Sequence, residues 1–268
     1  MKKFFSFLFT LIFAMGCNYA AKTYYLGFLS TIFPNYICAV ILAISFLLAA
    51  LIWVKLILRL KLKAVRMGKL RIKGVWIVCA LAIPAMYFFA VTLLHGKWYI
   101  GKIDVLPFIK SISVGILAYA FIDEITLRSL ILERAENAFG KCIAVIITSV
   151  VYVLPSVIYN LLYVKIDGNV ALSLVYSYTI PLLLSVLLAL VTLQSEGIAN
   201  AFIIHIFYSV SENLINVGKT KVNTALLNFV TDVNPWILFA IKSGAIIIFS
   251  AVAILLLAKK KKEEVLYW

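Results

Sequence analysis

The sequence predicts an all-α polytopic membrane protein, a bundle of about eight transmembrane helices. Hydrophobic residues make up 65% of the 268 residues and charged residues only 13%, whereas soluble domains average about 45–50% and about 25%. The apolar residues are grouped in runs that approach the roughly 20 residues needed to cross a bilayer. Because lipid replaces the polar surface that this composition cannot supply, we expect one integral membrane domain over residues 1–268.

Eight segments meet or approach the length and hydrophobicity of a membrane span. The fourth and the seventh are the least hydrophobic, because they contain ionisable groups. The first follows Lys2 and Lys3 and ends near Cys17, which resembles a secretory or lipoprotein signal. Since more spans follow, we expect this first helix to be retained. The segments are 4–20, 34–58, 74–94, 106–127, 142–163, 171–193, 197–216 and 235–258.

Basic residues are concentrated beside the apolar segments. Residues 55–73 contain eight Lys or Arg and no acid, residues 259–262 are four Lys, and Lys2 and Lys3 precede the first segment. With eight spans, all three clusters fall on one side, which the positive-inside rule assigns to the cytoplasm. We therefore expect a multi-pass plasma-membrane protein with cytoplasmic N- and C-termini. The bilayer, rather than nucleic acid, accounts for the net charge of +14.

One group of ionisable residues lies at the end of the fourth segment. Such residues cost about 2.5–3.5 kcal/mol each inside a membrane, so they are candidates for function. Glu124 and Arg128 are four residues apart, share a helix face and can pair. Asp123 lies about one residue's rotation away and could face a cavity. The pattern predicts an orienting ion pair and one free carboxylate, although a buried network that only fixes helix packing would use the same residues.

Two further polar stripes occur, one in the fifth segment and one in the seventh. Their steps of three and four residues place each stripe on one helix face. Pro155 lies within the first stripe, where it loosens the helix and frees a backbone carbonyl. Glu212 ends the second stripe and is expected to be solvated near the outer interface. The stripes are Ser149, Tyr152, Ser156 and Tyr159, and His205, Ser209 and Glu212.

The sequence resembles the CAAX-protease and bacteriocin-processing (CPBP) family of intramembrane proteases over about residues 106–216. That family carries three short motifs on separate helices. Its Glu-Glu-x-x-x-Arg motif corresponds to residues 123–128, its Phe-x-x-x-His motif to residues 152–156, and its His-x-x-x-Asn motif to residues 205–209. The spacing between the motifs also fits. The resemblance implies a core similar to that of CAAX endopeptidases.

The resemblance also implies roles for individual residues. In the family, the first carboxylate and the two motif histidines activate water or hold a metal, and the Asn helps to bind the oxyanion. Asp123 would accordingly be the base, oriented by Glu124 and Arg128. His205 would share the base role or serve as a candidate ligand for a divalent metal such as zinc. Ser209 would lie near the oxyanion.

Several positions depart from the family pattern. Asp123 stands for a Glu and is one methylene shorter, while Tyr152 stands for the motif Phe. Ser156 replaces a histidine and cannot act as a base at neutral pH. Small residues at positions 185 and 189 stand in the place of a close-packing Gly pair. Tyr152 and Ser156 are therefore motif positions whose chemistry is changed, and polar packing in the core is the favoured explanation for them.

Three functions follow as expectations. The resemblance implies an endopeptidase that cleaves membrane-associated substrates, such as prenylated C-terminal tails or bacteriocin-like leader peptides. An inactive relative acting in bacteriocin self-immunity or as a membrane scaffold is one alternative, and a small proton-coupled transporter is another. No cofactor is firmly indicated, because only two histidines occur and no Cys pair has metal-ligand spacing. The cysteines are Cys17, Cys38, Cys79 and Cys142.

Overall fold

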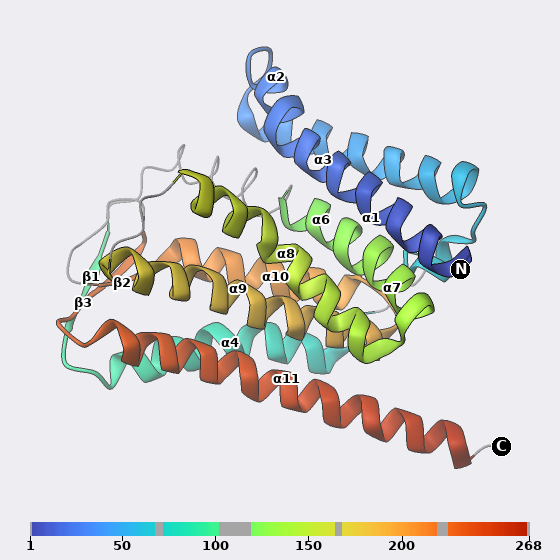
Figure 1. Cartoon of the computed structure of the whole chain (residues 1–268). Coiled ribbons are helices and arrows are strands. Elements are labelled where there is room, and N and C mark those ends of the chain that lie inside the picture. The colour runs from blue at the N-terminus through green and yellow to red at the C-terminus, as the bar shows by residue number, and fades with distance from the viewer. Residues whose placement is uncertain (1, 68–71, 102–118, 164–167, 219–224, 267–268) are drawn as a thin grey trace.

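The chain folds into a bundle of helices, as predicted (Figure 1). The structure is a computed structural model that describes residues 2–67, 72–101, 119–163, 168–218 and 225–266. Three helical stretches contain π-helical turns, at Ala21–Tyr25 (η1), Trp53–Ile57 (η2) and Glu124–Ile131 (η5), and Leu62–Val65 (η3) is a short 3₁₀ helix. The α-helices are α1 Lys2–Ala20, α2 Leu26–Ser30, α3 Asn35–Ile52, α4 Gly74–Thr92, α6 Tyr119–Asp123, α7 Leu132–Phe139, α8 Lys141–Tyr163, α9 Gly168–Ser195, α10 Ala199–Leu214 and α11 Pro235–Leu266.

Six helical stretches within the described residues are long and apolar enough to cross a membrane. They match six of the eight predicted segments. Of the other two, 106–127 lies mostly outside the described residues, and 197–216 corresponds to α10, which has 16 residues and is shorter than a typical span. The six stretches are Lys2–Ser30, Ile37–Ile57, Gly74–Thr92, Lys141–Ile158, Ser177–Ser195 and Pro235–Lys259.

The first helical stretch is longer than the sequence pattern suggested. The predicted segment ended at residue 20, because Lys22 soon interrupts the apolar run. In the structure the helix continues through η1 and α2 to Ser30. Lys22 is tolerated there because its ammonium group pairs with a carboxylate of another helix.

The packing of the helices encloses the polar residues of η5. Helix α9 packs against α8, α10 and α11, while α4 packs against α10 and α11. Helix α1 runs along η5 and α7, and η5 also contacts α8 and α9 (Figure 1). Leu187 and Leu188 of α9 are fully buried at the centre of this arrangement. The residues of η5 therefore lie inside the bundle, where unpaired charge is expensive.

A small sheet closes one end of the bundle. Strand β3 (Leu227–Val230) pairs antiparallel with β1 (Lys97–Ile100) and parallel with β2 (Ile215–Gly218). The sequence did not predict these strands, because four residues are too few to show a clear alternation. The sheet lies at the end opposite the two termini (Figure 1).

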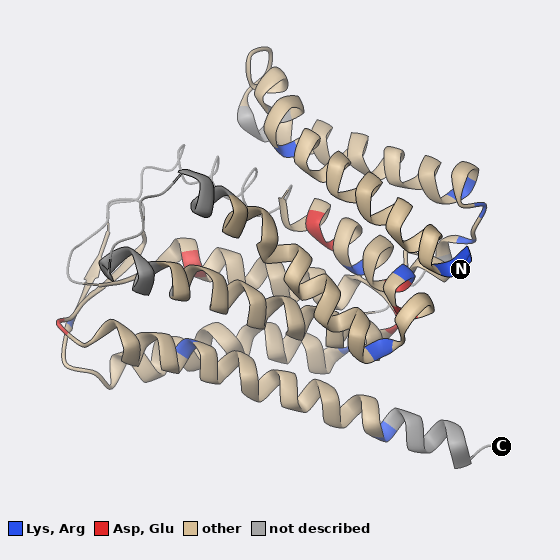
Figure 2. Cartoon of the chain, in the orientation of Figure 1, with Lys and Arg blue, Asp and Glu red and all other residues tan. Residues whose placement is uncertain are grey.

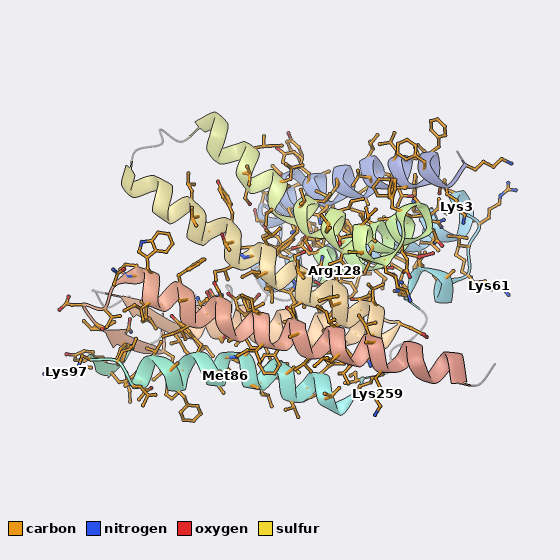
Figure 3. The ribbon with its side chains drawn as sticks, turned by 60° about the horizontal axis from the view of Figure 1, so that its bottom comes forward. Lys3, Lys61, Met86, Lys97, Arg128 and Lys259 are labelled. Atoms are coloured by element: carbon orange, nitrogen blue, oxygen red, sulfur yellow. The ribbon has the colours of Figure 1, made fainter. Side chains whose placement is uncertain are left out.

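Many of the Lys and Arg residues lie toward the end of the bundle that holds both termini (Figure 2). Lys3, Lys61 and Lys259 lie toward this end, whereas Lys97 lies at the other, and Arg128 lies between them inside the bundle (Figure 3). The described members of the three basic clusters therefore share one side. That this side faces the cytoplasm stays a prediction.

Candidate functional site

Glu124 lies between a histidine and an arginine deep in the bundle. Its Oε1 is 3.0 Å from Nδ1 of His205, and its Oε2 is 3.6 Å from Nε of Arg128. The side chains of Glu124 and Arg128 are 1% and 0% exposed. Since an ionised carboxylate only accepts hydrogen bonds, Nδ1 of His205 is the donor. The predicted pairing of Glu124 with Arg128 is present, and the first and third motifs meet.

Arg128 connects this group to two more helices. Its Nη2 donates to Oγ of Ser185, 3.1 Å away on α9, and its guanidinium lies 5.8 Å from the ring centre of Tyr152 on α8. The ring of Tyr152 in turn meets that of His205 edge to face, with 6.2 Å between centroids. Ser185 is fully buried, so it allows close packing, as expected of a small residue, and also supplies an acceptor.

The backbone that carries Glu124 and Arg128 is π-helical. All eight side chains of η5 are buried. One of them, Ser129, donates to the carbonyl oxygen of Val65, which ties the segment after α3 to the core. π-Helical turns are rare and occur frequently at functional sites. The local backbone is therefore consistent with a site at this position.

Asp123 has partners that the sequence did not indicate. Its Oδ1 accepts from Nζ of Lys22 at 2.5 Å and from Nδ2 of Asn18 at 3.0 Å. Asn18 also donates to Oγ1 of Thr126 at 3.2 Å, so its position is fixed by η5. Among the described residues, these direct contacts of Asp123 are made by α1 and η1, and its orientation by Glu124 and Arg128 stays a prediction. The longer first helix, and not the ion pair of η5, supplies the partners of Asp123.

Asp123 faces a cavity of about 400 Å³ between α1, η5, α8 and α9. This volume lies within the usual range for ligand sites, about 300–1,000 Å³. Lys22, Tyr152 and Ser156 also line it, whereas Glu124 is not among its described lining residues. The site therefore has two parts: an open cavity containing Asp123, and a sealed group behind it that contains Glu124.

The other polar residues of the motifs and stripes do not all lie at the open cavity. Ser156 is exposed to the cavity, and its carbonyl accepts from the hydroxyl of Tyr178 at 3.4 Å. Ser149 is buried, and its hydroxyl has no hydrogen-bond partner among the described residues. Ser209 is half-buried and does not line the cavity. The side chain of Tyr159 lies outside the described residues.

Glu212 is not simply solvated, as had been expected. Its Oε2 lies 2.7 Å from Nζ of Lys242 on α11, and the Lys242 side chain is 8% exposed. The ammonium group of Lys242 also lies 4.8 Å from the ring centre of Tyr87 on α4. The charge of Glu212 therefore joins α10 to α11, because the buried lysine in the last span needs a counter-ion.

The described side chains do not fit a zinc site. Within the described part of the chain, no group of three His, Cys, Asp or Glu residues could hold a metal ion. A catalytic zinc usually has three protein ligands. Ser156 stands where the family has a histidine, so a hydroxyl replaces one nitrogen ligand of the family's pattern. Metal binding by His205 stays a prediction, and no metal enters the chemistry proposed below.

Sequence reasoning missed the contribution of the first helix. Asn18 and Lys22 lie more than 100 residues before Asp123 and outside the segment that resembles the CPBP family. A polar residue and a cation beside an apolar run were visible in the sequence. Their cost in a membrane could have drawn attention to them, but nothing in the sequence named their partner.

A comparison with protein families identifies the segment that carries the motifs. Residues 104–211 match the family described as type II CAAX prenyl endopeptidase Rce1-like. The matched segment contains Asp123, Glu124, Arg128 and His205, and it leaves out α1. No curated protein and no solved structure gives a significant match to the chain.

Proposed function

We propose that the chain is an Rce1-like intramembrane endopeptidase in which Asp123 activates water, a proposal supported by the match of residues 104–211 to the type II CAAX prenyl endopeptidase Rce1-like family. The observation that carries this proposal is the placement of Asp123. It stands at the position of the family's first motif carboxylate and faces the cavity. Within the described residues, the hydrogen bonds of Asp123 with Asn18 and Lys22 both fall on Oδ1, which leaves Oδ2 for a water molecule.

The chemistry is a hydrolysis in which every proton has an acceptor. Asp123 takes a proton from water, and the hydroxide oxygen adds to the carbonyl carbon of the peptide bond. The carbon–nitrogen bond then breaks, the amine leaves with the proton returned by Asp123, and a carboxylic acid remains. General-base assistance of this kind contributes about 10²–10⁴-fold in rate.

Tyr152 is the best-placed donor for the oxyanion that forms during this reaction. Tyr152 lines the cavity, and its ring contacts both Arg128 and His205. A phenolic hydroxyl can stabilise the negative charge of a tetrahedral intermediate. Ser209, expected in this role from the family resemblance, lies away from the cavity lining. Glu124 and Arg128 would support the site by fixing the helices that carry it.

The substrate proposed here is a membrane-associated peptide, in keeping with the family. Lipidated C-terminal tails and bacteriocin-like leader peptides are the two classes to test. The basic end of the bundle, which holds both termini, supports a plasma-membrane protein with cytoplasmic termini under the positive-inside rule. The protein is then embedded in the lipid bilayer, which is its expected partner.

One alternative function has a specific observation in its favour. Ser156 replaces the second-motif histidine, and Lys22 neutralises the charge of Asp123 at 2.5 Å. Both features weaken the base, so an inactive relative that binds peptides without cleaving them is the second candidate. Such a protein would serve in bacteriocin immunity or as a scaffold.

The test is a cleavage assay on the whole protein in lipid vesicles, with a fluorogenic S-farnesylated peptide and a fluorogenic leader peptide. Asp123→Asn is expected to lower kcat by about 10²-fold or more. Asp232→Asn is the matched control, because Asp232 is exposed beyond β3 and far from the motifs in sequence. Cleavage that is equal in Asp123→Asn and in wild type contradicts the proposed base. Binding of either peptide without any cleavage by wild type favours the inactive relative.

A further inference from the structure

Two helices that wall the cavity each contain an internal proline. Pro155 lies inside α8 and Pro181 lies inside α9. Both prolines line the same cavity as Asp123. A proline inside a transmembrane helix is tolerated only when the backbone group that it leaves unpaired finds another partner.

Each proline removes the helical donor of the residue four positions earlier, because proline has no backbone N–H. The carbonyl of Val151 therefore lacks the backbone N–H that residue 155 would donate, and the carbonyl of Ser177 lacks the one that residue 181 would donate. Val151 and Ser177 also line the cavity. The two residues whose carbonyls lose their helical donors therefore line one cavity, from two different helices.

A peptide that is cleaved inside this protein has the complementary requirement. Its backbone must be extended at the scissile bond, so its N–H groups have no helical acceptor. Away from bulk water, an unpaired N–H costs several kcal/mol. Main-chain hydrogen bonds are how proteins commonly bind extended peptides.

We propose that the wall formed by α8 and α9 is a backbone-binding subsite, in which the carbonyls of Val151 and Ser177 accept N–H groups of an extended peptide. This inference rests on the proposed function and extends it, because it assigns the recognition of the substrate backbone to residues outside the three motifs. The subsite binds only the backbone of the peptide and makes no contact that depends on its side chains. It therefore selects for an unfolded peptide segment and tolerates different sequences near the scissile bond.

The position of the subsite suits cleavage. Asp123, Val151 and Ser177 line one cavity, so a peptide held by its N–H groups presents its carbonyls near the base. The hydroxyl of Tyr178 bridges the two helices by donating to the carbonyl of Ser156. This bond keeps α8 and α9 together beside the prolines.

The experiment restores the helical donors. Pro155→Ala, Pro181→Ala and the double variant each return an N–H to the helix, so folding is retained. In the vesicle assay with the fluorogenic S-farnesylated peptide, the double variant is expected to raise KM about tenfold and to change kcat by less than about twofold. Pro84→Ala is the matched control, because Pro84 lies inside α4 and borders a separate void beside Lys242. An unchanged KM in the double variant overturns the subsite.

A binding measurement separates this inference from the proposed function. The anisotropy of a fluorescent S-farnesylated peptide is followed with the Asp123→Asn protein, using peptides N-methylated at one backbone amide at a time. Methylation at one or two amides should weaken binding about tenfold, but it should have no effect when both prolines are Ala. If the effect of methylation depends on the two prolines but wild type cleaves no peptide, the subsite is supported and the proposed peptidase activity is contradicted. If Asp123→Asn abolishes cleavage but the effect of methylation does not depend on the prolines, the peptidase activity is supported and the subsite is contradicted. Absence of peptide binding also contradicts the subsite.

Discussion

Asp123 and Glu124 are neighbours in the chain but lie in opposite environments. Glu124 is sealed, 1% exposed, between Arg128 and His205. Asp123 opens onto a cavity of about 400 Å³ and pairs with Lys22, whose side chain is 24% exposed. The carboxylate of Glu124 is therefore closed off by its partners within the bundle, whereas the carboxylate of Asp123 is accessible to a molecule bound in the cavity.

The difference teaches which carboxylate holds the structure and which is available for chemistry. Breaking a buried ion pair typically costs about 3–5 kcal/mol, because the remaining charge stays buried. The pair of Lys22 with Asp123 is only part-buried, with side chains 24% and 12% exposed, so breaking it should cost less than breaking the fully buried pair. The partners of Glu124 belong to the segment that matches the family, while those of Asp123 belong to α1, outside the match. The following substitutions test this comparison, beginning with the largest expected effect.

Removal of the Arg128 charge should have the largest effect on stability. Arg128→Met keeps the volume but leaves Glu124 as an unpaired, buried charge, and it removes the hydrogen bond to Ser185. We expect the free energy of unfolding to fall by about 3–5 kcal/mol, measured by thermal and denaturant unfolding in detergent micelles. Lys141→Met is the control, because Lys141 is exposed at the start of α8. Equal stability of the two variants would mean that the sealed group is not a structural core.

Loss of the imidazole should have the next largest effect. His205→Leu leaves Oε1 of Glu124 without its donor, and hydrogen bonds to charged groups are worth about 1.5–3 kcal/mol. The same unfolding measurements should show a loss in that range. His95→Leu provides the matched comparison, since the side chain of His95 is exposed and its change should be near zero. If His205→Leu is as stable as wild type, the contact with Glu124 contributes little, and His205 is free for a catalytic role.

The features that the sequence predicted are local ones. Span positions follow from apolar runs, because the cost of placing polar groups in lipid acts residue by residue. The Glu124–Arg128 pair follows from a spacing of four residues on one helix. Ser185 was correctly expected to pack closely, since a small side chain is what a tight helix contact needs. In each case, the physical cause and its sequence pattern lie within one helix.

The features that could not be predicted depend on which helices meet. Asp123 contacts Lys22 across 101 residues of chain, and no periodicity encodes that pairing. The same holds for Glu212 and Lys242, 30 residues apart. The sheet was missed because its strands have four residues each, too few to show a period. Pairing between distant segments is a property of the packed bundle, and a sequence offers only the unpaired charge as a hint.

Restoring the missing histidine should raise activity. Ser156→His places an imidazole on the exposed cavity wall one turn after Tyr152, where the family's second motif has its base. Since general bases contribute about 10²–10⁴-fold when well placed, we expect at least about a tenfold gain in kcat on the fluorogenic peptides. Thr23→His is the control, because Thr23 is exposed on the η1 side of the same cavity. A gain in both variants, or in neither, would show that position 156 has no special relation to Asp123.

The smallest effect is expected for the ion pair at the cavity. Lys22→Met should lower the free energy of unfolding by less than Arg128→Met does, because the pair of Lys22 with Asp123 is only part-buried and Asn18 still donates to Oδ1 of Asp123. In a double-mutant cycle with Asp123→Asn, the coupling energy should likewise be smaller than in the cycle of Arg128→Met with Glu124→Gln. Equal coupling energies in the two cycles would mean that the ion pairs of Asp123 and Glu124 contribute equally to stability. Asp123 would then be as firmly held as Glu124, and a base that must exchange protons with water would have to be sought elsewhere in the cavity.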